Sequence, residues 1–269
     1  MTPDRVVRGG RMAMASGQLG SGKGMTTNAL GAASRFVAFH YSAAQVAILG
    51  GSRARGDELS GSDHDIVLLF ESVQNGAWRE MVEFEGQHVE VFAHDLGTLA
   101  YFCHAVDRPS GLPALPSMVA EGIVVLSRSP PALTAAREIA TETLRLGPPP
   151  LDTTTLRTRR FVISELAVAV RPDRDRHVLL AAGASLYTSL ADFALRAAGS
   201  WSASGKALPR ALTTMDPALA TRFETAFTTL FSMGDVAPVQ SLVDTVLTPY
   251  GGRLRGGYFM RAPAEWREG

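Results

Sequence analysis

Two aspartates, Asp63 and Asp65, stand one residue apart where the chain enters the apolar run at residues 66–70. Successive side chains of a strand point to opposite faces, so both aspartates should project to one side and His64, as a packing residue, to the other. Neighbouring carboxylates repel each other unless a cation lies between them. A few carboxylates at the rim of a packed sheet, completed by water and phosphate oxygens, suit Mg2+. The pair therefore predicts a metal site of the kind that nucleotide enzymes use.

A glycine-serine turn precedes the aspartates and predicts a phosphate site. Gly50 and Gly51 would let backbone amides approach an anion closely, and the Ser52 hydroxyl could donate a hydrogen bond. A helix starting just after Ser52 would aim its positive end at the same anion. Arg53 and Arg55 would either steady the phosphates or stay solvated, and we include Arg53 among the candidate nucleotide contacts. Phosphates and metal ions should thus meet between the turn and the aspartates.

A third carboxylate is expected, because two aspartates alone would hold two metal ions poorly. Residues 81–92 alternate apolar and polar side chains around a Glu-Gly-Gln turn, which is typical of a hairpin, and Glu90 lies on its second arm. If that arm lies beside the aspartate strand, Glu90 would complete the metal site and accept the proton of an attacking hydroxyl. Glu83 and Glu85 are close enough in sequence to be alternatives.

The elements that must position these residues fall into two parts, divided near "GPPP" at residues 147–150. Strands are predicted at residues 46–49 and 63–70, in both arms of the hairpin and at 122–127, and helices at 28–44, 130–146, 156–170, 177–198, 217–233 and 239–247. We therefore predict an α+β chain, with a mixed-sheet domain at residues 25–148 followed by an all-α domain at 149–269. Residues 1–24 are expected to be a disordered leader.

Composition narrows the classes of function. The 269-residue chain has 26 basic and 26 acidic residues, so it lacks the bulk positive charge with which proteins bind long nucleic acid. Its one cysteine, Cys103, excludes an internal disulfide and a cysteine-based zinc site and fits a cytoplasmic protein. No apolar run approaches the roughly 20 residues of a membrane span, so we expect no membrane association.

The sequence pattern around the turn resembles a known family. "GGSRARGDELSGSDHDIVLLF" followed by "HVEVF" is similar to the signature of the polymerase beta superfamily of nucleotidyltransferases, in which Gly-Ser, a spacer and Asp-x-Asp precede a distant third carboxylate. The resemblance covers about residues 46–92 and implies a small mixed sheet flanked by helices. It also implies two Mg2+ ions, a nucleoside triphosphate, expected to be ATP, and transfer of a nucleoside monophosphate with release of pyrophosphate.

The resemblance also implies roles for individual residues. Gly51 and Ser52 would bind the triphosphate, Asp63 and Asp65 the metal ions, and Glu90 the catalytic metal and the attacking hydroxyl.

The helical part is similar to the carboxyl-terminal domains of the aminoglycoside nucleotidyltransferase branch, notably over "GSWSASGKALPRAL". Lys206 in this segment could reach a phosphate from the second domain. The acceptor would carry a hydroxyl, and aminoglycosides, other small hydroxylated molecules, protein side chains and RNA ends all stay open.

Two alternatives compete with such an enzyme. The first is a non-catalytic nucleotide- or partner-binding module on the same fold, against which the three converging carboxylates argue. The second is a phosphate-loop ATPase using Lys23 in "GQLGSGKGMTT", but Gly24 stands where Ser or Thr should follow Gly-Lys, and no hydrophobic strand leads into the segment.

Overall fold

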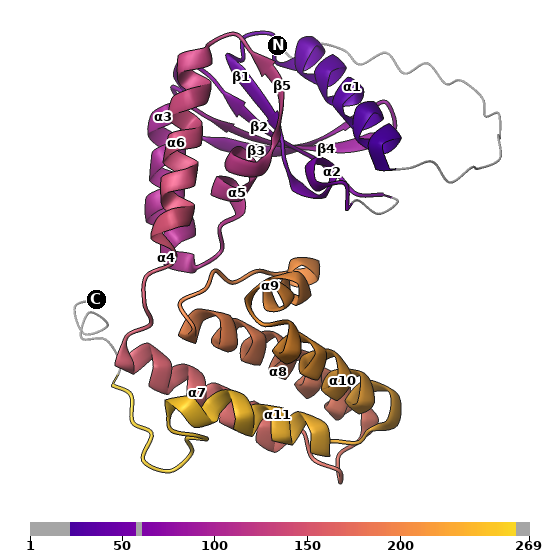
Figure 1. The fold of residues 1–269 in the computed structure, drawn as a ribbon, viewed down its shortest axis with the longest axis vertical. Coiled ribbons are helices and arrows are strands. Elements are labelled where there is room, and N and C mark those ends of the chain that lie inside the picture. The colour runs from indigo at the N-terminus through magenta and orange to yellow at the C-terminus, as the bar shows by residue number, and fades with distance from the viewer. Residues whose placement is uncertain (1–21, 58–60, 262–269) are drawn as a thin grey trace, which may run out of the picture.

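The computed structural model describes residues 22–57 and 61–261, with a sheet region followed by a helical region (Figure 1). The sheet region contains α1 (Gly22–His40), β1 (Val46–Leu49), α2 (Gly51–Arg55), β2 (His64–Leu69), β3 (Trp78–Phe84), β4 (Gln87–His94), α3 (Leu96–Tyr101), the π-helix η1 (Phe102–Asp107), α4 (Arg108–Ser110), α5 (Ala114–Glu121), β5 (Ile123–Ser127) and α6 (Pro130–Leu146). The helical region contains α7 (Thr153–Ala169), α8 (Arg176–Ala197), the 3-10 turn η2 (Gly205–Ala207), α9 (Leu208–Met215), α10 (Pro217–Met233), α11 (Ala237–Leu247) and the 3-10 turn η3 (Thr248–Tyr250).

The five strands form one mixed sheet in the order β3-β4-β2-β1-β5. Strands β2 and β4 are parallel, and the other neighbouring pairs are antiparallel. The β3–β4 hairpin closes through Glu85 and Gly86, whose φ angles of 51° and 72° match the two-residue turn that twists with its strands. The predicted α+β class, with a mixed sheet first and helices after it, is confirmed.

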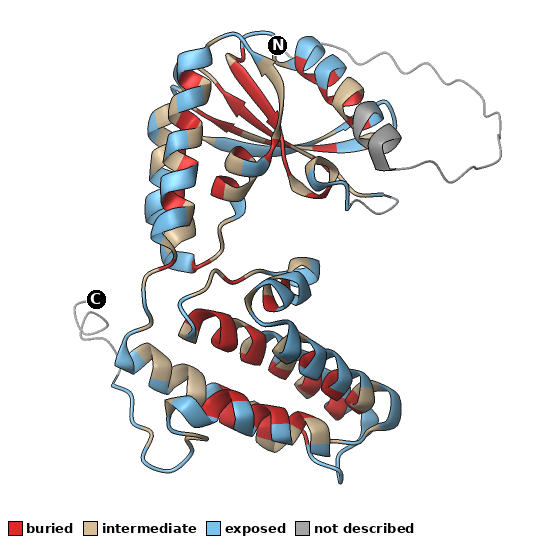
Figure 2. Ribbon diagram, in the orientation of Figure 1, coloured by how far each residue is buried: buried red, intermediate tan, exposed pale blue. Residues whose placement is uncertain are grey.

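The two faces of the sheet are covered by different helices (Figures 1 and 2). Phe36 of α1 packs in one core cluster with Ile66 and other alternate residues of the strands. Val67 packs on the opposite face, in a cluster that α3, η1, α5 and α6 complete. Because side chains alternate along β2, Asp65 emerges on the face of α5 and α6, whereas the buried His64 lies on the face of α1.

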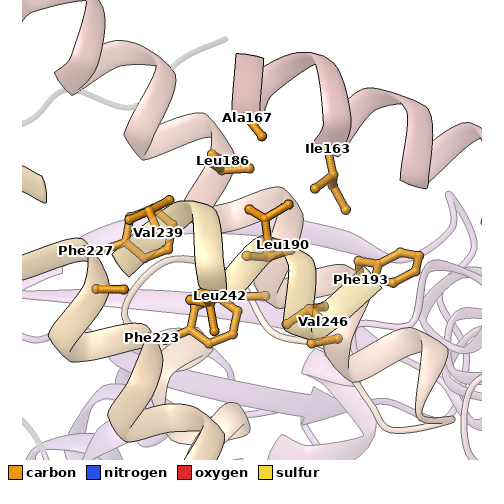
Figure 3. Close-up of a cluster of buried hydrophobic side chains, with 14 of the residues drawn as sticks. Ile163, Ala167, Leu186, Leu190, Phe193, Phe223, Phe227, Val239, Leu242 and Val246 are labelled. Atoms are coloured by element: carbon orange, nitrogen blue, oxygen red, sulfur yellow. The ribbon is translucent and has the colours of Figure 1, made fainter. Parts of the chain in front are cut away.

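The helical region has a core of its own, built around α8. Figure 3 shows side chains from α7, α8, α10 and α11 meeting there, including Ile163, Leu190, Phe227 and Leu242, all of them almost fully buried. Helix α8 is also long and apolar enough to cross a membrane, which differs from our expectation for the sequence, and half of its most apolar stretch is buried inside the protein. A buried core helix passes the same test, so length and composition are weak evidence for a span.

Most predicted elements are present, with two kinds of difference. Helix α1 spans Gly22–His40 rather than residues 28–44, so residues 22–24 of the expected leader are helical, and residues 1–21 lie outside the described part. The helices from α3 to α5 and α9 were not predicted, because they are short and interrupted by glycine or proline. Helix α3 is defined by a capping box instead, in which Asp95 accepts a hydrogen bond from the Thr98 amide.

Candidate active site

The turn between β1 and α2 brings the chain against the aspartate strand. The Gly50 amide donates to the Asp65 carbonyl at 2.8 Å, which joins the end of β1 to the start of β2. Gly51 has a φ of 64°, and a Cβ atom at this position would overlap the Asp65 carboxylate. Ser52 is buried in the first turn of α2. Only glycine can place the backbone this close to the carboxylate, which explains why Gly51 precedes Ser52.

Strand pairing sets Asp65 and Glu90 side by side. The two residues are direct partners in the parallel β2–β4 ladder, so their side chains leave the sheet on the same face. Asp63, just before β2, is close enough for its charge to act on Asp65. Burial, together with the charges of Glu90 and Asp63, raises the pKa of Asp65 above its ordinary value, and Lys206 and Arg55 oppose this effect. The three predicted carboxylates thus occupy one neighbourhood.

The alternatives to Glu90 lie elsewhere on the hairpin. Glu83 is an exposed residue of β3, the edge strand, and pairs across the ladder with His88. Glu85 sits in the turn and forms an ion pair of 2.6 Å with Arg35 of α1. Of these three glutamates, Glu90 is the one whose register places it beside Asp65.

Arg79 holds the Glu90 carboxylate in this structure. The Arg79 guanidinium, on β3, forms an ion pair with Glu90 and lies over the Phe92 ring at 5.2 Å from its centre. Within residues 22–57 and 61–261, no group of three His, Cys, Asp or Glu side chains is placed to hold a metal ion. The ion pair with Arg79 would have to open before Glu90 could share a cation with Asp65.

The donor set nevertheless fits a divalent cation. Asp63, Asp65 and Glu90 carry hard carboxylate oxygens of the type that Mg2+ prefers. Burial raises the pKa of Asp65 most, and the charges of Glu90 and Asp63 raise it further, an effect that a cation beside Asp65 would relieve. Reorientation of one exposed partner, Arg79, would free Glu90 for this role, since the Arg79 side chain is 68% exposed.

The predicted cationic residues are placed differently from one another. Arg53 donates to the Ser62 carbonyl at 2.6 Å and to the Asp63 carbonyl at 3.3 Å, so it fixes the loop that carries the first aspartate. Lys206, in the η2 turn of the helical region, is exposed and acts electrostatically on Asp65. The helical region therefore contributes positive charge to the surroundings of Asp65. The Arg53 nitrogen atoms that donate these hydrogen bonds are occupied by the Ser62 and Asp63 carbonyls.

A second cationic group joins Arg55, which the sequence suggested as a possible phosphate contact, with Arg210, which it did not. Asp57, just after α2, accepts from Arg55 at 3.3 Å and from Arg210 of α9 at 2.6 Å. Arg55 and Arg210 both line the same cavity as Asp65. No pattern in the sequence could connect Arg210 with residues about 150 positions earlier, because only the tertiary structure brings α9 within ion-pair distance of Asp57.

The cavity lies between the two regions and has a volume of about 780 Å3. Hydrogen bonds across its back join the regions: the Trp201 indole N–H donates to the Leu144 carbonyl at 3.1 Å, and the Ser202 amide donates to the Gly111 carbonyl at 2.8 Å. Its wall includes Asp65 and Phe92 from the sheet. A volume of this size accommodates a drug-sized ligand next to the carboxylates.

Comparisons with known proteins bear on this region. The family model of the nucleotidyltransferase domain matches residues 32–104. The matched residues include the glycine-serine turn and all three carboxylates, so a nucleotidyl transfer function is supported in general terms. No curated protein matches the chain. Among solved structures, a nucleotidyltransferase-like protein from Exiguobacterium sibiricum has a TM-score of 0.37 and 11% identity, covering 84% of this chain and 75% of its own. We draw nothing from a likeness at that level.

Proposed function

We propose that the protein is a metal-dependent nucleotidyltransferase that moves a nucleoside monophosphate from a nucleoside triphosphate, expected to be ATP, to a hydroxyl, with release of pyrophosphate. The observation that carries the proposal is the pairing of Asp65 with Glu90 in adjacent parallel strands, with Asp63 close by. The Gly51-Ser52 turn stands against the same carboxylates, and all these residues lie inside the matched domain.

The proposed reaction needs a base and an electrophile held in line. Glu90 would accept the proton of the acceptor hydroxyl, whose oxygen attacks the α-phosphorus. The bond from that phosphorus to the oxygen bridging to the β-phosphate breaks, and pyrophosphate leaves. Asp63, Asp65 and Glu90 would hold two Mg2+ ions, which when bound would neutralise phosphate charge and lower the pKa of the hydroxyl.

Residues around the carboxylates would bind the triphosphate. The Gly51 and Ser52 amides and the Ser52 hydroxyl would donate to phosphate oxygens from the turn, and Lys206 would supply charge from the helical region. Arg53 would act as a positioning residue, because its hydrogen bonds hold the loop before Asp63.

We extend the proposal to the organisation of the chain. The domains would span residues 25–148 and 149–269, in an arrangement like that of the aminoglycoside nucleotidyltransferase branch, and the protein would act in the cytoplasm. The chain between α6 and α7, residues 147–152, carries few elements of its own and suits a joint between domains.

Pyrophosphate release tests the proposal. The full chain would be incubated with Mg2+, each nucleoside triphosphate in turn and a panel of hydroxylated acceptors. Activity should appear with at least one combination and fall at least about 100-fold in the Asp63→Asn/Asp65→Asn variant. Glu83→Gln, an exposed acid on the neighbouring edge strand, is the matched control and should keep full activity. A folded wild type that binds nucleotide but releases no pyrophosphate would indicate a binding module instead.

A further inference from the structure

The cavity beside Asp65 has two chemically different parts. One part holds Arg55, whose charge acts on Asp65, and Arg210, which shares the partner Asp57 with Arg55. The rest of its wall is mainly apolar, with the larger side chains Phe92, Leu112, Met118, Leu144, Trp201 and Met215. The polar side chains on this wall are mostly hydroxyls, from serines and Thr214. The apolar part therefore suits a body that carries few charges.

Positive charge on a ligand would find little compensation here. Asp65 is the acidic residue that lines the cavity, against the arginines Arg55, Arg145 and Arg210. These arginines already pair with Asp57 or Glu142, neither of which lines it. An ammonium group removed from water needs a carboxylate partner. Asp65 would bind a metal ion, so it would not be free to pair with a ligand's ammonium group.

One buried hydroxyl in the wall awaits a partner. Ser202 is 3% exposed, and its Oγ has no hydrogen-bond partner in the part of the chain that the structure describes. Buried polar atoms are nearly always paired, but this Oγ is itself covered by the wall, so a ligand in the cavity would reach it only through a water molecule or after a shift of the wall. A ligand with at least one polar group on an otherwise apolar body would satisfy it in that way.

We propose that this cavity binds the acceptor, and that the acceptor is a small hydroxylated molecule with an apolar or aromatic body and no positive charge. The assignment rests on the proposed nucleotidyl transfer. It follows from the continuity of the cavity with Asp65 and Phe92, because Phe92 lies two residues beyond Glu90 on the same face of β4. An acceptor in the cavity thus has its hydroxyl next to the proposed base. A polyamine such as an aminoglycoside is excluded by this assignment.

Three probes with the same hydroxylated ring and different charges test the class: 4-hydroxyphenylacetamide, 4-hydroxyphenylacetate and tyramine. Their binding to the full chain would be titrated by ligand-observed NMR, with Mg2+ and a non-hydrolysable ATP analogue present. The uncharged and anionic probes should bind about tenfold more tightly than tyramine. Preference for tyramine, or no binding of any probe, would overturn the proposal.

Substitutions in the cavity wall test whether the probes bind in this cavity. Thr214→Trp fills the cavity from the exposed side of α9 and should weaken the uncharged probe at least about tenfold, whereas Thr213→Trp, on the same helix but outside the lining, should not.

The ATP analogue, titrated into the same variants, separates the two proposals. Its affinity should be unchanged in Thr214→Trp. If that variant loses the analogue instead, the cavity holds the nucleobase and the acceptor assignment fails, while nucleotidyl transfer stands. If the wild type binds no nucleoside triphosphate, the proposed function fails and the acceptor assignment fails with it.

Discussion

Asp65 and Glu90 are direct register partners in the parallel ladder between β2 and β4. Two acids that face the same side of neighbouring strands are costly in the absence of a cation, because each raises the free energy of ionising the other. The pKa of Asp65 is raised, mainly by burial and further by the charges of Glu90 and Asp63. The protein therefore keeps an electrostatically unfavourable pair of acids on two inner strands of its sheet, which is typical of a functional site.

Replacement of Asp65 should stabilise the metal-free protein. The pKa of Asp65 is higher in the folded chain than its ordinary 3.8, so the native state binds more protons just above that pH and the free energy of unfolding falls as pH rises through this window. At neutral pH the penalty is fully present. Asp65→Asn should raise the free energy of unfolding by about 1 kcal/mol, measured by urea denaturation at pH 7 in EDTA.

Added Mg2+ provides the control for this substitution. The wild type should be stabilised by millimolar Mg2+ with a triphosphate analogue, and Asp65→Asn should not, because ligands stabilise only the state that binds them. A variant less stable than the wild type in EDTA would show that ionised Asp65 makes a favourable contact instead.

Gly51→Ala should disrupt both the fold and the site. A Cβ atom at Gly51 would meet the Asp65 carboxylate, and the φ of 64° is strained for alanine. We expect a loss of at least about 3 kcal/mol in unfolding free energy and no detectable binding of an ATP analogue. Gly76→Ala has a φ of 84° and open space around the added atom, so it should cost only about 1 kcal/mol and leave binding intact. Equal losses in the two variants would contradict the steric argument.

Sequence patterns were sufficient for the parts of the site that are local. The alternation around Glu90 predicts the hairpin, and the apolar run after Asp65 predicts a buried strand, since both signals depend on a period of two. The parallel pairing of these strands was a condition in the sequence argument and is now an observation.

Long-range packing explains what the sequence did not reveal. Arg210 meets Asp57 only because the tertiary structure brings α9 within ion-pair distance of it, and Arg79 meets Glu90 only through the β3–β4 register. Exposed arginines have no periodic signal, so their partners cannot be read from spacing. Arg53 was suggested by the sequence as a phosphate contact, whereas in the structure its guanidinium donates hydrogen bonds to backbone carbonyls.

Arg79→Ala should make the metal site easier to fill. The Arg79 guanidinium pairs with Glu90 and would compete with a cation for the same carboxylate. Because exposed ion pairs contribute about 0.2–1 kcal/mol, the Mg2+ concentration for half-maximal binding of an ATP analogue should fall by up to about fivefold. Arg128→Ala, on an exposed arginine near the other edge of the sheet, is the control. A higher Mg2+ requirement would mean that Arg79 holds Glu90 in its working position.

Arg210→Ala should weaken nucleotide binding. Arg210 lines the same cavity as Asp65, and a charge-assisted hydrogen bond contributes about 1.5–3 kcal/mol. We expect the Kd of an ATP analogue with Mg2+ to rise about tenfold by calorimetry. Arg222→Ala, which removes an arginine bonded to Thr245 on the far helices, should leave that Kd unchanged. An unchanged Kd in Arg210→Ala would restrict its role to the ion pair with Asp57.

His94 should make the protein sensitive to acid. Burial lowers the pKa of His94 to about 4, so between pH 6.5 and 4 the unfolded chain binds more protons and stability falls as pH falls. The loss should reach on the order of 3 kcal/mol at pH 4, opposed in part by the raised pKa of Asp65. Urea denaturation from pH 4 to 7 should show a flatter dependence for His94→Leu, whereas His88→Leu, on the exposed part of β4, should keep the wild-type slope. Identical slopes in all three proteins would mean that the pKa of His94 is the same in the folded and unfolded chains.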